Sequence, residues 1–288
     1  MSQRLATAEP WLCAAPLLAV LAPFFVAPII VVLAASFLQG DGAGGMLPQF
    51  TLDNYAAVFG AGLTWKLYLS TVKFAVLTWA LTLLIGFWIA YFLVFQVRNR
   101  LLAIGLFLLC TVPFWTSNII RMISWIPLLG KNGLVNAVLQ GSGVIGQPLE
   151  FLLFSDFAVV VAYVHQLTIF MIVPIFNTMS RIDRRTVEAA RDAGASRWEA
   201  MRLVIIPLSK NGIALGSIFV LAIVMGDFFV VKVMSGGGSA SVVSALYEDI
   251  GVLQYPPAAA SAVVLLAVVV LMVSLILRTV DVRRELAR

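Results

Sequence analysis

An acidic residue, Asp227, lies in the middle of an apolar stretch, between Gly226 and Phe228. If that stretch crosses a membrane, its carboxylate costs at least about 2.5–3.5 kcal/mol to insert, so it is a functional candidate by default. A carboxylate beside aromatic rings can pair with an ammonium group while the ring faces attract its charge. The alternative is an internal ion pair with Arg121 or Lys232, although Lys232, five residues on, is poorly placed on the same helix face.

Aromatic and acidic residues elsewhere are weaker candidates for a binding path. Trp115 and Trp125 are ten residues apart, so on one helix their directions would differ by about 80°. One of them could line a path, whereas a membrane-interface position is the commoner role of tryptophan. Tyr247, Glu248 and Asp249 lie in the last polar segment between apolar stretches. They could receive a substrate or a binding protein, or belong to a solvated loop.

Catalytic and metal chemistry are not expected. The chain has one histidine, His165, with no other ligand type at metal-binding spacing. A hydrogen-bonded contact between helices is the better interpretation. A single histidine excludes a di-His site, and no nucleophile–base constellation appears in the sequence, so we predict no catalytic residues, no metal and no enzyme. Cys13 and Cys110 both lie in apolar runs and are interpreted as isolated buried thiols.

Composition indicates an integral membrane protein. Of the 288 residues, 61% are apolar and 11% are charged, and the mean hydropathy is +1.02. A soluble domain is about half apolar and about a quarter charged. This excludes an ordinary soluble enzyme, a disordered chain, a collagen-like fibre and a disulfide scaffold. Because the apolar runs are long and unbroken, helices are favoured over a β-barrel.

Six stretches are long enough for spanning helices, which need about 20 residues. They cover residues 11–38, 68–95, 101–127, 157–179, 211–234 and 256–278. The first contains three prolines, so we expect a kinked helix, retained because it is too long for a signal peptide. The third contains Pro113 and Arg121 and is the least regular. The sequence therefore predicts an all-α membrane protein with one transmembrane domain over residues 1–288.

The basic residues predict the orientation. Cytoplasmic segments are enriched in lysine and arginine. With both termini in the cytoplasm, the N-terminus, the 96–100 turn, the 180–210 loop and the tail after Leu277 hold 14 of the 19 basic residues. These are Arg4, Arg98, Arg100, Arg181, Arg184, Arg185, Arg191, Arg197, Arg202, Lys210, Arg278, Arg283, Arg284 and Arg288. This placement also argues against nucleic-acid binding, despite the net charge of +5.

The long cytoplasmic loop has the signals of two short helices. Asp183 or Thr186 can cap the first helix, and Gly194 stands where a left-handed helix end is expected. Ser196–Glu199 forms a capping box that starts the second helix, and Pro207 is expected to close that element before the fifth span. Such a compact element suits docking into a cleft on a soluble partner. The alternative is a solvated interfacial loop.

This loop resembles the EAA motif of binding-protein-dependent ABC importer permeases: E-A-A, three residues, G, nine residues, then I-x-L-P. Seven positions carry the match: Glu188, Ala189, Ala190, Gly194, Val204, Ile206 and Pro207. Val204 and Ile206 are conservative replacements of the usual Ile and Leu. The resemblance implies the type I ABC importer permease fold with cytoplasmic coupling helices. It assigns coupling to the ATPase to Glu188, Ala189, Ala190, Gly194 and Pro207.

Other stretches resemble the polyamine branch of this family, the spermidine/putrescine permeases. They are Pro113–Thr116, Arg121–Trp125, Gly130–Asn136 and Gly226–Phe228 followed by Gly236–Gly238. The resemblance implies a path for a polyamine or a similar small organic cation. The candidate path residues are Asp227, Phe228, Trp115, Trp125, Tyr247 and Glu248. Asp227 departs from the glutamate expected in many relatives, which keeps the charge and shortens its reach.

The resemblance also implies partners. Two permease chains, the second expected to be a paralogue, enclose the path, and their EAA helices dock on a pair of ATP-binding cassette ATPase subunits. A periplasmic binding protein delivers the substrate. This chain has no G-x-x-x-x-G-K-[ST] motif, so we expect no cofactor in it, with ATP and Mg²⁺ bound by the ATPase. The expected surroundings are bacterial inner-membrane lipids, without nucleic acid.

The sequence leaves alternatives open for the substrate and for the class of transporter. Permeases for an opine, an aminophosphonate or ferric iron look similar, and one carboxylate does not settle a substrate. A secondary transporter would usually show inverted repeats, and none is evident in the sequence. It would also leave the EAA loop unexplained.

Overall fold

The computed structural model describes residues 15–41 and 44–278. Its chain divides into two compact units. The first combines residues 1–65 with 245–266, and the second combines residues 66–244 with 267–288. Most of the predicted site residues belong to the second unit.

The first unit contains a long apolar helix and a small hairpin. The helix runs from Ala15 to Ala35, through a π turn at Ala22–Val26 into α2 (Ala27–Ala35). It is followed by the antiparallel strands β1 (Leu38–Gly40) and β2 (Met46–Phe50), and by α3 (Asp53–Gly60). The Asn54 amide fixes this arrangement by donating to the carbonyls of Ser36 and Leu38, at 3.0 and 2.9 Å. The hairpin is absent from the all-α prediction.

The second unit is built from long helices joined by short ones. Its elements are most of α4 (Gly62–Tyr91) with a π turn at Phe92–Gln96, α5 (Arg100–Thr111), α6 (Asn118–Leu129), α7 (Leu134–Gly141), α8 (Asp156–Met179), α9 (Arg184–Asp192), α10 (Arg197–Ala200), α11 (Ile206–Gly226) and α12 (Phe229–Met234). Two further helices, α13 (Val242–Gly251) and α14 (Tyr255–Arg278), are shared between the units.

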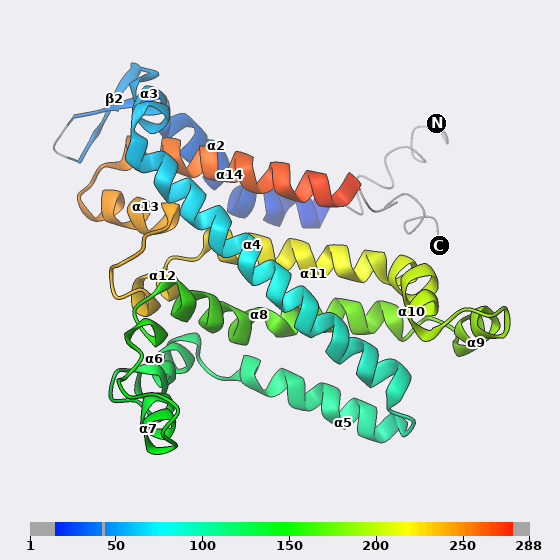
Figure 1. Ribbon diagram of the computed structural model, residues 1–288. Helices are drawn as coiled ribbons and strands as arrows, with labels where there is room; N and C mark the ends of the chain where they lie inside the picture. Colours follow the sequence, from blue (N-terminus) through cyan, green and yellow to red (C-terminus); the bar gives the residue numbers. More distant parts are fainter. Residues whose placement is uncertain (1–14, 42–43, 279–288) are drawn as a thin grey trace, which may run out of the picture. The chain divides into compact units, whose positions relative to one another are not determined.

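The core of the second unit is the pair α8 and α11. These helices lie side by side, with α5 on the other flank of α8 (Figure 1). Gly212 and Gly216 of α11 face Pro174 and Met171 of α8 so closely that an added Cβ would overlap them. Small residues at such contacts let helix backbones approach, which is how helices associate without a hydrophobic driving force in lipid. The indole of Trp79 in α4 donates to Ser217 of α11 at 2.7 Å.

The third span over residues 101–127, predicted to be the least regular, is broken in the structure. Helix α5 ends at Thr111, a 3₁₀ turn follows at Val112–Trp115, and the next helical stretch, Asn118–Gly141, is bent by 91° from the first. Pro113 accounts for the break, because proline has no N–H to donate and its ring clashes with the preceding helical turn. Trp115 and Trp125 therefore lie on different elements, and the angle expected for a shared helix does not apply.

The fifth span differs from the prediction at both ends. The chain stays helical from Arg197 to Gly226, so Pro207 does not close the preceding element. A π turn at Met201–Ile205 comes just before it, in which the Ile206 amide bonds to the Met201 carbonyl. The widened turn accommodates the proline near the start of α11. At the other end, the predicted helix 211–234 breaks after Gly226.

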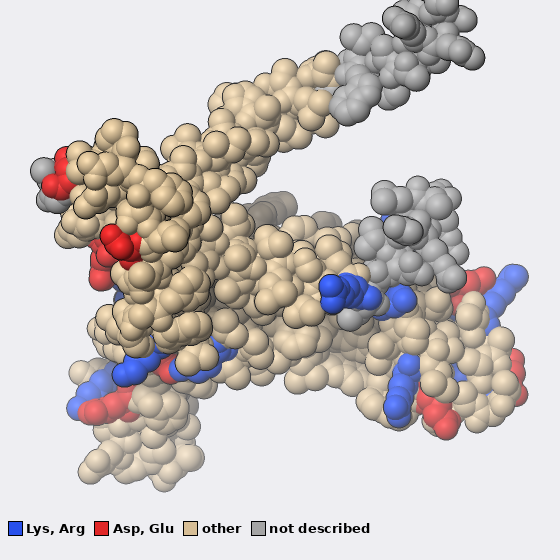
Figure 2. Space-filling view, turned by 90° about the horizontal axis from the view of Figure 1, so that it is seen from above, with Lys and Arg blue, Asp and Glu red and all other residues tan. Residues whose placement is uncertain are grey.

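Within the described residues, five helices are long and apolar enough to cross a membrane, or six if the bent pair after Arg100 counts as one span. The first span stays helical past Pro23 and Pro28, while its predicted start at residues 11–14 lies outside the described residues. On the face drawn in Figure 2, the charged side chains gather toward the ends of the long helices. A wide uncharged surface between them suits contact with lipid.

We predict that Gly212→Ala destabilises the second unit. Its Cβ would meet the hydroxyl of Thr178 and the backbone carbonyl of Pro174, whose carbon would be 2.9 Å away. Overpacking of this kind costs about 1–3 kcal/mol. The thermal unfolding midpoint of the detergent-solubilised chain, followed by tryptophan fluorescence, measures the effect.

The matched control is Gly105→Ala in α5, where an added Cβ meets no atom within 4 Å. Because alanine favours the helix over glycine, this control is expected to be neutral or stabilising by up to about 1 kcal/mol. Equal midpoints for the two variants would contradict the close approach of α8 and α11.

Candidate functional site

The cytoplasmic loop folds as the capped helix–turn–helix predicted from its sequence. The Asp183 carboxylate accepts the Arg185 amide at 2.9 Å and caps α9. At the end of α9, the Gly194 amide bonds to the Arg191 carbonyl, and the Ala195 amide bonds to the Ala190 carbonyl. Gly194 has φ +95°, a left-handed conformation that glycine adopts without a steric penalty.

The second short helix begins at the predicted capping box. The Ser196 hydroxyl accepts the Glu199 amide at 3.2 Å, and the Glu199 carboxylate accepts the Ser196 amide at 2.8 Å. Two donors at the helix start are thereby satisfied. Because α10 leads through the π turn into α11 without a break, the loop is rigidly connected to the fifth span.

The predicted coupling residues lie on this element and mostly face outward. Glu188 and Ala189 are exposed on α9, Ala190 is half-buried, and Gly194 and Pro207 are exposed. Within the described residues, the Glu188 carboxylate makes no hydrogen bond or ion pair, so it is free to bond to another molecule. The α9–α10 turn therefore presents charged side chains outward, which is compatible with docking on another molecule.

Asp227 occupies a break between helices. After α11 ends at Gly226, Asp227 is extended, and α12 starts at Phe229. The Asp227 carboxylate accepts the Val230 amide at 2.9 Å and the hydroxyl of the buried Tyr163 at 3.2 Å. The carboxylate therefore caps α12 and still has lone pairs for a cation. Phe228, the next predicted path residue, is half-buried at this break.

The predicted tryptophans and Arg121 are distributed around the bent third span. Trp115 is 79% exposed, whereas Trp125 on α6 packs edge-on against the His165 ring of α8, with centroids 5.4 Å apart. This contact agrees with a helix–helix role for the histidine. Arg121 donates to the Thr116 carbonyl at 3.3 Å, so among the described residues it bonds to backbone rather than to Asp227.

The other predicted path residues, Tyr247 and Glu248, lie on α13 in the first unit. Both are exposed, and Tyr247 is 52% exposed. Burial raises the pKa of the neighbouring Asp249 carboxyl, and the charge of Glu248 adds to the effect. These adjacent acidic groups make a negatively charged stretch on α13.

Sequence reasoning missed two groups in the second unit. Tyr163, which holds Asp227, is 64 residues away along the chain, and no local pattern marks it. The other is a cluster around Asp156, whose carboxylate accepts from Lys73 and from Ser239, both at 2.5 Å. The cluster ties α4, the start of α8 and the segment after α12 together. Its only sequence signal is an acidic residue directly after a capping serine, Ser155.

The arrangement is suited to binding rather than catalysis. Within the described residues, no group of three His, Cys, Asp or Glu side chains could hold a metal ion. What the geometry offers is a carboxylate in a helix break and, at the far end of the same helix, the capped turn between α9 and α10. One continuous helix connects the two.

Comparisons with known proteins agree with this reading of the fold. The family model described as binding-protein-dependent transport system inner membrane component matches residues 82–285. The chain is 34% identical over 213 residues to the spermidine/putrescine transport system permease protein PotB of Salmonella typhimurium (strain SL1344), covering 74% of this chain and 73% of that protein. PotB of Escherichia coli (strain K12) is 33% identical over 213 residues, covering 74% and 76%.

A solved structure shows the same fold. The chain is similar to one in the crystal structure of a bacterial alginate ABC transporter in complex with alginate pentasaccharide-bound periplasmic protein. The TM-score is 0.72 at 16% identity, and the match covers 96% of this chain and 95% of that chain. The predicted importer permease fold is thereby confirmed.

We predict that Gly194→Leu opens the turn between α9 and α10. An added Cβ at this position meets no atom within 4 Å, so the substitution tests backbone strain alone. A left-handed residue with a Cβ costs roughly 1–2 kcal/mol, so the amides of residues 194 and 195 should exchange with deuterium about 5–30-fold faster. Hydrogen exchange with mass spectrometry measures this.

The control is Ala193→Leu, which adds the same side chain one residue earlier, where φ is −75°. Its amides should exchange as in the unaltered chain. Protection that survives in Gly194→Leu would show that the turn does not need a glycine.

Proposed function

The chain belongs to the family of binding-protein-dependent transport system inner membrane components, and on this premise we propose that it forms half of the path by which an ATP-driven importer carries a polyamine or a similar small organic cation. Family membership makes the chain a permease subunit, a transport protein of the inner membrane without an ATPase site of its own.

The observation that carries the substrate proposal is Asp227 in the break between α11 and α12. Its carboxylate accepts from Tyr163 and from the Val230 amide through one oxygen, and keeps further acceptor capacity for an ammonium group. Phe228 beside it can add a ring face for the positive charge. The similarity to two permeases named for spermidine and putrescine supports the same substrate class. Trp115, Trp125, Tyr247 and Glu248 remain proposed path residues.

The proposed partners follow from the family and from α9 and α10, which together we call the docking element. The exposed Glu188 and Ala189 of α9 would dock on an ATP-binding cassette ATPase dimer, which we expect to bind the ATP and Mg²⁺. A second permease chain, expected to be a paralogue, would complete the path. A periplasmic binding protein would deliver the substrate. The basic residues of the loops support an orientation with both termini in the cytoplasm.

Two alternative functions differ from the proposed one in their solute or in their partners. A permease of the same family for an opine, an aminophosphonate or ferric iron would assemble identically but bind a different solute. A secondary transporter would move its substrate without an ATPase partner. The exposed Glu188 carboxylate and the capped α9–α10 turn favour an importer permease over a secondary transporter, because a secondary transporter does not dock on an ATPase.

We predict that Asp227→Asn lowers spermidine uptake by the assembled transporter about tenfold or more. The asparagine oxygen can still accept from the Val230 amide, so α12 keeps its cap while the charge is lost. A hydrogen bond to a charged group contributes about 1.5–3 kcal/mol, and each 1.4 kcal/mol is a factor of ten. Uptake of radiolabelled spermidine into proteoliposomes, measured against concentration, tests this.

Two comparisons separate charge from capping. Asp227→Glu keeps the charge and should retain part of the uptake, whereas Asp227→Ala removes both charge and cap and should also lower thermal stability. Full uptake by Asp227→Asn would reduce Asp227 to a helix cap.

We predict that the chain, tagged at Arg288 and purified gently from native membranes, brings down three kinds of subunit. Mass spectrometry should identify an ATPase with a Walker A loop, a second permease and a periplasmic binding protein. The binding protein can then be screened for spermidine and putrescine. Recovery of the chain alone would favour a secondary transporter. A binding protein that does not bind polyamines would indicate another class of substrate.

A further inference from the structure

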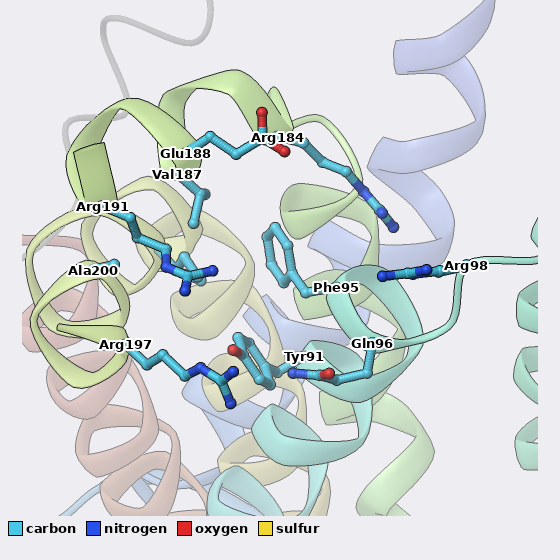
Figure 3. Close-up of a pocket in the computed structure, with 11 residues that line it drawn as sticks. Tyr91, Phe95, Gln96, Arg98, Arg184, Val187, Glu188, Arg191, Arg197 and Ala200 are labelled. Carbon is cyan, nitrogen blue, oxygen red and sulfur yellow. The ribbon is translucent and has the colours of Figure 1, made fainter. Parts of the chain in front are cut away.

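A cavity of about 320 Å³ lies between the end of α4 and the cytoplasmic helices. It is lined on one side by Tyr91, Phe95 and Arg98, and on the other by α9 and α10 (Figure 3). Four arginines line it, and Glu188 is the one acidic residue among its lining residues. The arginines are Arg98, Arg184, Arg191 and Arg197. Their formal charge exceeds that of Glu188 by three, so the cavity attracts anions.

The arginines form two pairs, one on each side of Phe95. In Figure 3, Arg197 of α10 reaches toward Tyr91 and Arg191 of α9 reaches into the cavity toward Phe95, while Arg184 points toward Arg98. Arg184 is already bonded, since its guanidinium donates to the Val94 carbonyl at 2.7 Å. Within the described residues, the guanidinium groups of Arg191 and Arg197 have no protein acceptor. The guanidinium groups of Arg191 and Arg197 therefore point into the cavity and are available to bond to a ligand.

The position of Glu188 separates the two pairs further. Its side chain extends toward Arg184 rather than toward Arg197 (Figure 3). A carboxylate near Arg184 weakens the attraction of that side for an anion. The side formed by Arg191, Arg197 and Tyr91 has no carboxylate among the cavity's lining residues. An anion would therefore bind there first.

The cavity also lies at the end of a candidate membrane-spanning helix. This helix, from Gly62 to Gln96, is long and apolar enough to span a membrane. Aromatic residues such as Tyr91 and Phe95 are typical of such helix ends. Basic pockets beside helix ends on the cytoplasmic side bind anionic lipid headgroups. The cytoplasmic placement rests on the orientation given under the proposed function.

We propose that Arg191, Arg197 and Tyr91 bind a phosphate group, supplied by the headgroup of an anionic phospholipid. Guanidinium groups bind phosphate oxygens with paired hydrogen bonds, and the tyrosine hydroxyl supplies a further donor. The bound phosphate connects α9 and α10 to the end of α4. It thereby holds the docking element in place on the span behind it.

The test is lipid binding to the full chain, purified with its co-purifying subunits in a neutral detergent. Native mass spectrometry measures the affinity for dioleoyl phosphatidylglycerol and for dioleoyl phosphatidylcholine, whose choline is repelled by the arginines. We expect phosphatidylglycerol to bind at least about tenfold more tightly. The double variant R191Q/R197Q should lose this preference.

The matched control is Arg185→Gln, next to Arg184 on α9 but outside the cavity lining. It removes one positive charge from the same helix and should keep the lipid preference. R191K/R197K retains both charges without the paired geometry and should bind with intermediate affinity. An unchanged preference in R191Q/R197Q, or an equal loss in Arg185→Gln, would overturn the site.

A second measurement uses the unaltered chain and so does not depend on the variants folding. Phenylglyoxal modifies accessible arginines, and peptide mass spectrometry reads out each position. Phosphatidylglycerol should protect Arg191 and Arg197 at least about tenfold more than phosphatidylcholine does. Equal modification with both lipids would contradict the proposal.

Two further arms identify the source of the anion. Inorganic phosphate at millimolar concentration should not displace phosphatidylglycerol, and protection by phosphate alone would assign the site to a soluble anion and overturn the lipid. Protection of Arg191 and Arg197 that appears only when the ATPase is bound would assign them to protein docking instead. Spermidine uptake, measured in the same preparations, is a separate readout, so a failed transport proposal leaves the lipid result interpretable.

Discussion

The close packing of α8 on α11 is the contact on which the rest of the second unit depends. Gly212 and Gly216 bring the two backbones together, and both ends of this pair have a role. At one end, α8 leads through a short turn into α9, and α11 continues from α10. At the other end, Tyr163 of α8 meets Asp227 after α11. A helix of 30 residues from Arg197 to Gly226 is about 45 Å long. If the proposed ATPase partner tilts α9 and α10, the motion therefore reaches Asp227 through one continuous helix.

Helix breaks in a span are tolerated only where another group satisfies the backbone, since lipid offers no hydrogen bonds. The break at Asp227 meets this requirement because the carboxylate accepts the Val230 amide. The break after Thr111 does so as well, with the Thr116 hydroxyl and Arg121 bonded to backbone carbonyls. Polar residues thus appear in the apolar stretches where the helices are interrupted. Asp227 is one of these positions, and its charge fits both a structural cap and the proposed binding role.

Local rules predicted the cytoplasmic loop almost residue by residue. The Asp183 cap, the left-handed Gly194 and the Ser196–Glu199 capping box each depend on a few neighbouring residues. The errors arose where local and long-range effects compete. Pro113 interrupts a helix that hydropathy alone would continue, while Pro207 does not, because a π turn precedes it. The contact of Asp227 with Tyr163 and the arginine cavity join segments far apart in the chain, so no window of the sequence contains them.

Side chains rather than the fold must decide what the permease carries. The fold is shared, at 16% identity, with a chain of a transporter crystallised with an alginate-bound periplasmic protein. The fold alone therefore does not identify the solute of this chain. In the proposed path, the Asp227 carboxylate selects the sign of the charge, because a like charge in a site of low dielectric is strongly repelled. Chain length is a weaker discriminant, since one methylene is worth only about 1–3 kcal/mol in a fitted pocket. One carboxylate can thus separate cations from anions, but distinguishing spermidine from putrescine requires a second contact at a fixed distance from Asp227.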